Sequence, residues 1–113
     1  MAEDRSALFG TGDVIRHLRF EYRGVVIDVD ATFQGTDEWY EQMATSRPPR
    51  DEPWYHVLVH DAMHSTYVAE RNLEADTAPA PIRHPHLREF FDRRVDAVGG
   101  RGGRYVKDDV VLQ

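Results

Sequence analysis

The sequence predicts a mainly β domain: a small SH3-like β-barrel with a long loop that contains a short helix, followed by a C-terminal helix. Three observations lead to this prediction. Residues 54–60 are the most aromatic and β-branched run of the chain, and residues 66–70 form a second strand-like run after a polar break. Residues 25–30 alternate as a half-buried antiparallel strand does. Apolar residues recur at helical spacing within residues 85–98.

The barrel core, expected over residues 9–76, begins after a flexible N-terminus of residues 1–8. Residues 14–19 have the composition of a strand. Gly24 then indicates a bulge or a close approach of two backbones, because a glycine inside a strand contributes no side chain to packing. The strand of residues 25–30 follows directly.

The longest irregular stretch, residues 31–53, leads from this strand to the central hairpin. Thr36 has the side chain of an N-cap and acidic residues follow it, so we expect a short helix over residues 36–43. Three prolines within residues 47–53 exclude regular structure there, because proline lacks a backbone donor and fixes φ. A loop of this length in a small domain is often functional.

After the hairpin the chain is expected to leave the sheet, and residues 82–83 to add a short closing strand. Pro85 suits the first position of the C-terminal helix, about residues 85–98. The apolar face of that helix comprises Leu87, Phe90, Phe91, Val95 and Val98. Two glycines end it, and residues 99–113 form a Gly-rich linker and tail. An open four-stranded sheet covered by the helix is the alternative to the barrel.

Composition excludes several classes of protein and site. The chain has 113 residues, a net charge of −6 and no cysteine, so disulfides and thiolate metal sites are excluded. Residues 1–76 carry 15 acidic and 7 basic residues, a net of −8, and an acidic body repels the phosphates of DNA. No apolar run is long enough to span a membrane, and the polar N-terminus does not suit a secretory signal. We therefore expect a cytoplasmic protein without a membrane partner.

No motif for catalysis, a cofactor or a metal stands out. Asp28 and Asp30 share a strand face, about 7 Å apart, but a chain of this size leaves no room for a deep sugar cleft between them. His56 and His60 lie about 13 Å apart along one strand and cannot share a metal ion. We expect no catalytic residues, no metal site and no cofactor, and a solvated face around the two aspartates.

The aromatic residues and arginines are the candidate binding residues. Tyr55 and Tyr67 are expected to pack in the core, whereas the long loop and its flanks offer a surface for a partner protein. The candidate partner contacts are Trp39, Tyr40, Arg47, Arg50 and Trp54. The candidate contacts to nucleic acid are Arg16, Arg19 and Arg23, although solvation and neighbouring acidic residues explain these arginines better.

Four segments in this order resemble one family. They are FGTGDVIRH (residues 9–17), YRGVVIDVD (residues 22–30), PWYHVLV (residues 53–59) and TYVAERNL (residues 66–73). They look like the HspQ family, also called the YccV-like or hemimethylated-DNA-binding domain. The similarity covers roughly residues 9–76, with a weaker extension that places the domain over residues 9–98.

The resemblance implies an SH3-like fold, self-association of no defined stoichiometry and two different functions. One is a bacterial heat-shock role, in which an adaptor or specificity factor binds the Lon protease or its clients and modulates proteolysis. The other is recognition of hemimethylated DNA, which affects replication initiation. Relatives in F-box proteins and in a plastid adaptor of the Clp protease favour protein recognition. We therefore expect a non-enzymatic, HspQ-like protease adaptor, with the DNA-binding regulator as the alternative.

Overall fold

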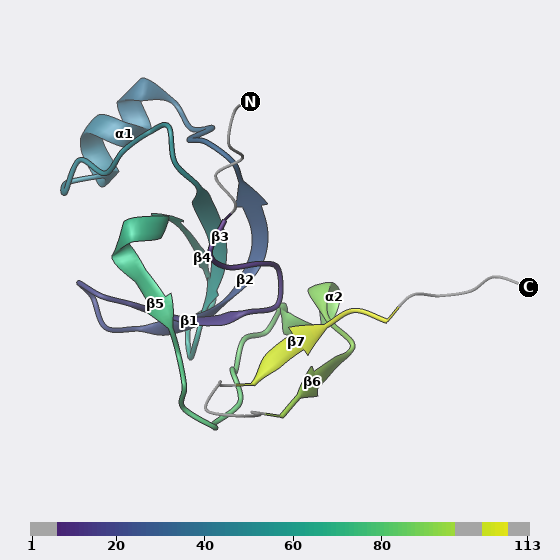
Figure 1. Cartoon of the computed structure of the whole chain (residues 1–113). Coiled ribbons are helices and arrows are strands. Elements are labelled where there is room, and N and C mark those ends of the chain that lie inside the picture. Colours follow the sequence, from purple (N-terminus) through teal and green to yellow (C-terminus); the bar gives the residue numbers. More distant parts are fainter. Residues whose placement is uncertain (1–6, 97–102, 109–113) are drawn as a thin grey trace, which may run out of the picture.

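The computed structural model describes residues 7–96 and 103–108, and it confirms a mainly β domain. A five-stranded antiparallel sheet is accompanied by a two-stranded hairpin and short helices (Figure 1). In chain order the elements are β1 (Val14–His17), β2 (Arg23–Asp30), α1 (Asp37–Met43), β3 (Trp54–Val59), β4 (Ser65–Ala69), the 3-10 turn η1 (Glu70–Asn72), β5 (Leu73–Ala75), α2 (Leu87–Phe90), β6 (Arg93–Val95) and β7 (Arg104–Val106). Among the described residues, no helix is long and apolar enough to cross a membrane.

The strand order of the sheet is β4-β3-β2-β1-β5, and every neighbouring pair is antiparallel. β4 and β5 are its two edges, and they are not paired with each other, so the sheet is open where a closed barrel was expected. Figure 1 shows α1 above one end of the sheet, and α2 with the β6–β7 hairpin near the opposite end.

The central hairpin is confirmed, and β3 is its inner strand. β3 pairs with β2 on one side and with β4 on the other, so it is an interior strand of the sheet. Tyr55 and Val57 point into one core, which we call the central cluster. Its other members are Ile15, Val26, Val68 and Leu73. Burial of these apolar side chains supplies the main driving force for the fold.

A β-bulge in β2 changes which side chains face the core. Val26 lies opposite Val57, but Asp28 lies opposite His56, so Ile27 is the extra residue on the β2 side. Side chains alternate every residue along a strand, and one inserted residue therefore reverses their phase. As a result Val29 packs against the central cluster, on the same side as Val26, whereas the sequence pattern had placed these two valines on opposite faces.

Gly24 marks a close approach of two backbones, as expected. A Cβ atom at this position would lie 2.4 Å from Val57 Cγ1 and 2.6 Å from the carbonyl oxygen of Leu58. Both distances are far below a normal contact, and the second involves backbone that is held in the β2–β3 ladder. β3 can pack this close to β2 only because position 24 has no side chain.

The predicted short helix in the long loop is confirmed as α1. The Thr36 hydroxyl accepts a hydrogen bond from the Trp39 backbone N–H at 3.0 Å, and Asp37 and Glu38 lie in the first turn. This cap satisfies a backbone donor that would otherwise lack an intrahelical partner.

The predicted C-terminal helix over residues 85–98 is wrong beyond Phe90. α2 spans only Leu87–Phe90, Phe91 is extended, and Arg93–Val95 forms β6, paired with β7. Three residues of the predicted apolar face still face the core, because Leu87 and Phe90 pack against a cluster that contains Phe91. Long-range strand pairing has overridden the local helical spacing, since a short helix depends on packing for its stability. Val98 lies outside the described residues.

Two further expectations after the hairpin were also wrong. Residues 73–75 do not leave the sheet: η1 turns the chain so that β5 pairs with β1. Residues 82–83 form no strand, although Ile82 is buried. The fifth strand therefore comes directly from the run that follows β4.

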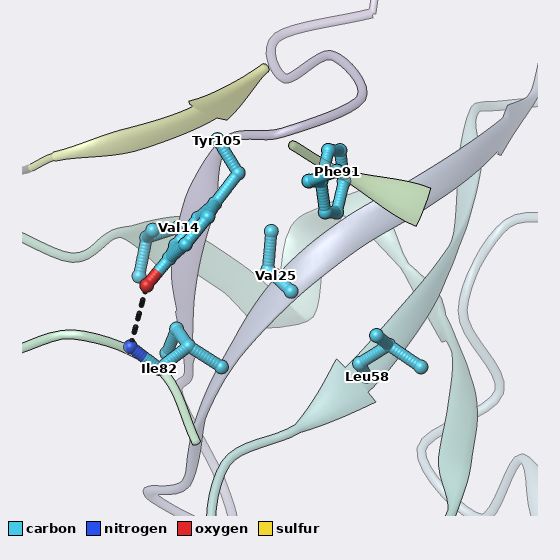
Figure 2. Close-up of a cluster of buried hydrophobic side chains, with 6 residues drawn as sticks. All are labelled: Val14, Val25, Leu58, Ile82, Phe91 and Tyr105. Atoms are coloured by element: carbon cyan, nitrogen blue, oxygen red, sulfur yellow. Dashed lines mark hydrogen bonds between the residues drawn. The ribbon is translucent and has the colours of Figure 1, made fainter. Parts of the chain in front are cut away.

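Part of the expected C-terminal tail belongs to the core. Tyr105 of β7 is buried, its N–H donates to the Gly12 carbonyl at 2.8 Å, and its hydroxyl accepts a hydrogen bond from the Ile82 N–H at 2.8 Å (Figure 2). We call its surroundings the C-terminal cluster, formed by Val14, Val25, Leu58, Ile82, Phe91 and Tyr105. The remaining tail residues 99–102 and 109–113, and residues 1–6 of the expected flexible N-terminus, lie outside the described residues.

We predict that Gly24→Ala lowers the free energy of unfolding by about 1–3 kcal/mol, because overpacking a core forces backbone shifts. Urea unfolding of the two proteins measures the difference. Gly10→Ala is the matched control, because a Cβ at Gly10 has nothing within 4 Å. Equal losses in the two variants would contradict the close approach.

We predict that Tyr105→Phe destabilises the protein by about 1–3 kcal/mol, because the buried Ile82 N–H loses its acceptor while the ring stays in place. The same unfolding measurement applies, and unchanged stability would show that the hydrogen bond from Ile82 to Tyr105 contributes little.

Candidate functional site

Five aromatic side chains from different parts of the chain meet at one end of the sheet. Phe33 lies at the centre of this aromatic cluster, with its ring 4.8 Å from that of Trp54 and 5.5 Å from that of Tyr40. Trp39 and Tyr67 complete it, each with a ring 5.9 Å from Phe33. The loop, α1, β3 and β4 each contribute, so the cluster fastens the long loop to the hairpin.

Two of the predicted partner contacts are buried in this cluster. Trp54 is 1% exposed and its indole N–H donates to the Pro49 carbonyl at 3.0 Å. Tyr40 is 7% exposed and its hydroxyl donates to the Pro48 carbonyl at 2.7 Å. Both side chains hold the proline segment against the sheet, and of the predicted aromatic contacts only Trp39 is half-buried.

The predicted arginine contacts lie over the outside of the aromatic cluster. The Arg50 guanidinium is 4.7 Å from the centre of the Tyr40 ring and 5.0 Å from that of Phe33, and it also pairs with Asp37. Arg47 lies 6.0 Å from the Tyr40 ring and pairs with Glu41 at 2.9 Å. The exposed part of the predicted set is therefore Trp39, Arg47 and Arg50.

A groove of about 460 Å³ opens beside this cluster. The turn between β1 and β2, the end of α1 with the residues after it, and the β3–β4 hairpin with η1 form it. Its lining includes Trp39, Trp54, Tyr67, Val68 and Ala69. Arg19 and three histidines also line it, but none of the aspartates and glutamates that the structure describes does, in a protein whose net charge is −6.

Two large apolar side chains are exposed at this groove. Phe20 is 68% exposed and Met43 is 62% exposed, and both line the groove. Phe20 comes from the β1–β2 turn and Met43 from the last turn of α1. Exposed apolar side chains that gather around a hollow are typical of an interaction surface.

One wall of the groove is an open sheet edge. Val59 N–H donates to the His64 carbonyl and Glu70 N–H donates to the Pro53 carbonyl. Hydrogen-bonded pairs alternate along an antiparallel ladder, so Thr66 and Val68 face β3 with their main-chain groups. The main-chain groups of Tyr67 and Ala69 therefore point away from β3, on the side where an added strand would pair.

His17 organises the turn that carries Phe20. Its Nδ1 accepts hydrogen bonds from the backbone N–H groups of Arg19 and Phe20, both at 3.1 Å, and its ring stacks on Phe20 at 4.7 Å. Burial, and then the charge of Arg19, lower the pKa of His17 below its ordinary value. Nδ1 can accept only while the ring is neutral, so the turn depends on the unprotonated histidine.

Tyr67 joins the groove to β2. Its hydroxyl donates to Asp30 Oδ2 at 2.6 Å and accepts from the Gln34 N–H at 3.0 Å. Burial, and then the hydrogen bond to Asp30, raise the pKa of Tyr67. The side chain is therefore a neutral hydrogen-bond donor. Its ring was expected to pack in the core, and it is partly buried in the aromatic cluster.

The predicted nucleic-acid contacts are mostly engaged by carboxylates. Arg23 is largely buried and pairs with Asp76 at 2.6 Å, and Arg16 lies between Glu21 and Glu74 at 3.2 and 3.1 Å. Arg19 is exposed and, within the described residues, has no ion pair.

Sequence reasoning named Arg19, Trp39 and Trp54, which line the groove, but it missed the two exposed apolar residues. Phe20 lies between two predicted strands, and Met43 ends the predicted loop helix. Only the exposed apolar character of Phe20 within a polar turn could have drawn attention to it. No local sequence pattern indicates that β4 is an edge strand, because strand order depends on pairing between distant parts of the chain.

We predict that stability falls as the pH is lowered from about 7.5 to about 5. Because the folded-state pKa of His17 lies below its ordinary value, its contribution is fully present above 6.5 and is lost as the pH falls towards the lowered value. Urea unfolding across this range should show a smaller slope in His17→Asn. The slope should not vanish, because the pKa of His60 is also lowered by burial. Equal slopes would contradict the role of His17.

A comparison with known protein families matches the part of the chain that contains the groove and the core. A family model described as hemimethylated DNA-binding protein YccV-like matches residues 7–97, which include all five strands of the main sheet, α1 and the aromatic cluster. The match covers well over half of the 113 residues. The resemblance found in the four sequence segments is therefore confirmed, and the chain belongs to the YccV-like family.

Proposed function

We propose that this chain is a non-enzymatic adaptor of the HspQ type, which binds an extended segment of a partner protein in the groove beside β4. The observation that carries the proposal is an open strand edge flanked by exposed Phe20 and Met43. A peptide strand that pairs with a sheet edge gains affinity from main-chain hydrogen bonds and specificity from pockets for its side chains.

The geometry supports this binding mode in detail. Tyr67 and Ala69 direct their main-chain groups outward, two residues apart, which is the repeat at which a neighbouring strand forms hydrogen bonds. Phe20 and Met43 lie on the other walls of the same groove and offer apolar contacts for the side chains of the peptide. Each apolar side chain buried in this way contributes about 1.5 kcal/mol or more.

Charge indicates the class of segment. Among residues 7–96 and 103–108, one arginine and no carboxylate line the groove, so a neutral or acidic apolar segment suits it better than a basic one. In this proposal the segment belongs to the Lon protease or to one of its clients, in the cytoplasm. Binding of this segment changes which clients Lon degrades. We also propose that the fold is related to SH3-like barrels. His17 of β1 and Val68 of β4 line the same groove, although β2 and β3 lie between these strands in the sheet. The sheet must therefore be strongly curled.

Recognition of hemimethylated DNA is the second candidate, because the description of the family names it. It would need phosphate contacts, and two of the three candidate arginines are paired with carboxylates. The groove residues are therefore the better guide to a partner.

The test is the rate at which Lon degrades several client proteins with and without this chain. We expect Phe20→Ser combined with Met43→Ser to weaken the effect about a hundredfold or more, the loss that follows from about 1.5 kcal/mol for each of the two side chains. Met63→Ser is the matched control, because Met63 is 81% exposed and does not line the groove.

Ala69→Pro tests the strand edge itself. Ala69 has φ −71°, which proline adopts, and its N–H points away from β3, so the substitution removes a donor from the edge without removing a hydrogen bond to β3. Ala69 is 3% exposed and packs with Trp54, so the larger proline ring also lowers stability. Thermal unfolding checks that each variant folds. Unchanged degradation of every client would refute the proposal. Preferential binding of hemimethylated over unmethylated duplex near physiological salt would support the second candidate instead.

A further inference from the structure

Three potential metal ligands from two strands converge beside the groove. One ligand atom each from Asp28, Asp30 and His56 lies within 4.8 Å of the other two. The set contains one imidazole nitrogen and two carboxylate oxygens, which suits borderline divalent cations such as Zn²⁺, Co²⁺ and Mn²⁺. The proposed peptide-binding role uses neither of the carboxylates, so the convergence calls for a separate explanation.

The bulge in β2 creates this arrangement. Without Ile27 as the extra residue, Asp28 would lie opposite Tyr55 and share the face of the central cluster. With it, Asp28 lies opposite His56, and both aspartates face the same side as the histidine. Bulges redirect side chains at functional sites in this way.

Within the described part of the chain, neither carboxylate pairs with an arginine or a lysine. Asp30 Oδ2 contacts His56 Nε2 at 3.1 Å and the Tyr67 hydroxyl at 2.6 Å, and Asp28 accepts only from the Val29 N–H at 2.9 Å. Elsewhere in the structure, Asp76 and Asp61 each pair with an arginine. A divalent cation between Asp28 and Asp30 would relieve their mutual repulsion.

A second layer of hydrogen bonds already orients one ligand. The Tyr67 hydroxyl that donates to Asp30 accepts from the Gln34 N–H at 3.0 Å, and the Tyr67 ring lies 4.5 Å from that of His56. Outer partners of this kind hold a ligating carboxylate in place and raise metal affinity.

We propose that Asp28, Asp30 and His56 form a divalent metal site with Zn²⁺-like preference. His56 Nε2 and Asp30 Oδ2 already lie 3.1 Å apart, close to the separation of two ligands held about 2.0–2.2 Å from one ion, and the exposed Asp28 side chain can move to complete the set. Three protein ligands leave at least one coordination position for water or for a carboxylate of a bound partner. His56 and Tyr67 line the groove, so the ion would lie at its margin.

The test is titration of the full chain with one metal at a time. Calorimetry measures the binding of Zn²⁺, and visible absorption measures the binding of Co²⁺. We expect one ion per chain at this site and a higher unfolding temperature when Zn²⁺ is present. Asp28→Asn and His56→Gln should each lose more affinity than Tyr67→Phe, whose loss we expect to be about tenfold. Glu38→Gln, an exposed acid outside the site, is the matched control.

His84 and His86 require their own control, because their rings lie 5.6 Å apart and could bind Zn²⁺ independently. In a His84→Gln/His86→Gln background the Asp28 and His56 effects should persist. Loss of binding in that background, or unchanged binding in Asp28→Asn and His56→Gln, would overturn the proposal. Both readouts are independent of Lon, so a failure here is distinguishable from a failure of the proposed adaptor function.

Discussion

The pairing of β3 on both of its sides is the constraint on which the rest of the structure depends. Because β2 and β4 enclose it, its side chains reach all three apolar clusters: Leu58 the C-terminal cluster, Tyr55 and Val57 the central cluster, and Trp54 the aromatic cluster. The two faces of one strand thus connect elements that are far apart in sequence. Close packing at Gly24 makes this possible, since a side chain there would separate β2 from β3.

Trp54 links this strand to the surface that we assign to binding. Its indole N–H and the Tyr40 hydroxyl donate hydrogen bonds to two proline carbonyls, which satisfies these buried donors and fastens the proline segment of the long loop to the sheet. The loop residues therefore act as a rigid wall, and the exposed apolar contacts come from Phe20 and Met43 at the rim. A preformed wall lowers the entropy lost when a partner binds.

The bulge in β2 separates the packing role of that strand from its polar role. Val29 is turned towards the central cluster, while Asp28 and Asp30 are turned towards His56 and Tyr67. One inserted residue thereby supplies both an apolar contact and a polar site on the opposite face. The same side chain, Tyr67, belongs to the aromatic cluster and contacts Asp30, so the groove and the polar site are mechanically connected.

Local patterns in the sequence determined the mainly β class, the central hairpin, the Thr36 cap of α1 and the family, because alternation, turn chemistry and capping act over a few residues. Tertiary structure decided the rest. Residues 93–95 left a helical pattern to pair with β7, and Ile27 became a bulge that brought His56 to the two aspartates. Phe20 and Met43, 23 residues apart in sequence, come to line one groove only in the folded chain. These outcomes depend on contacts between residues far apart in the chain, whose energies no local pattern encodes.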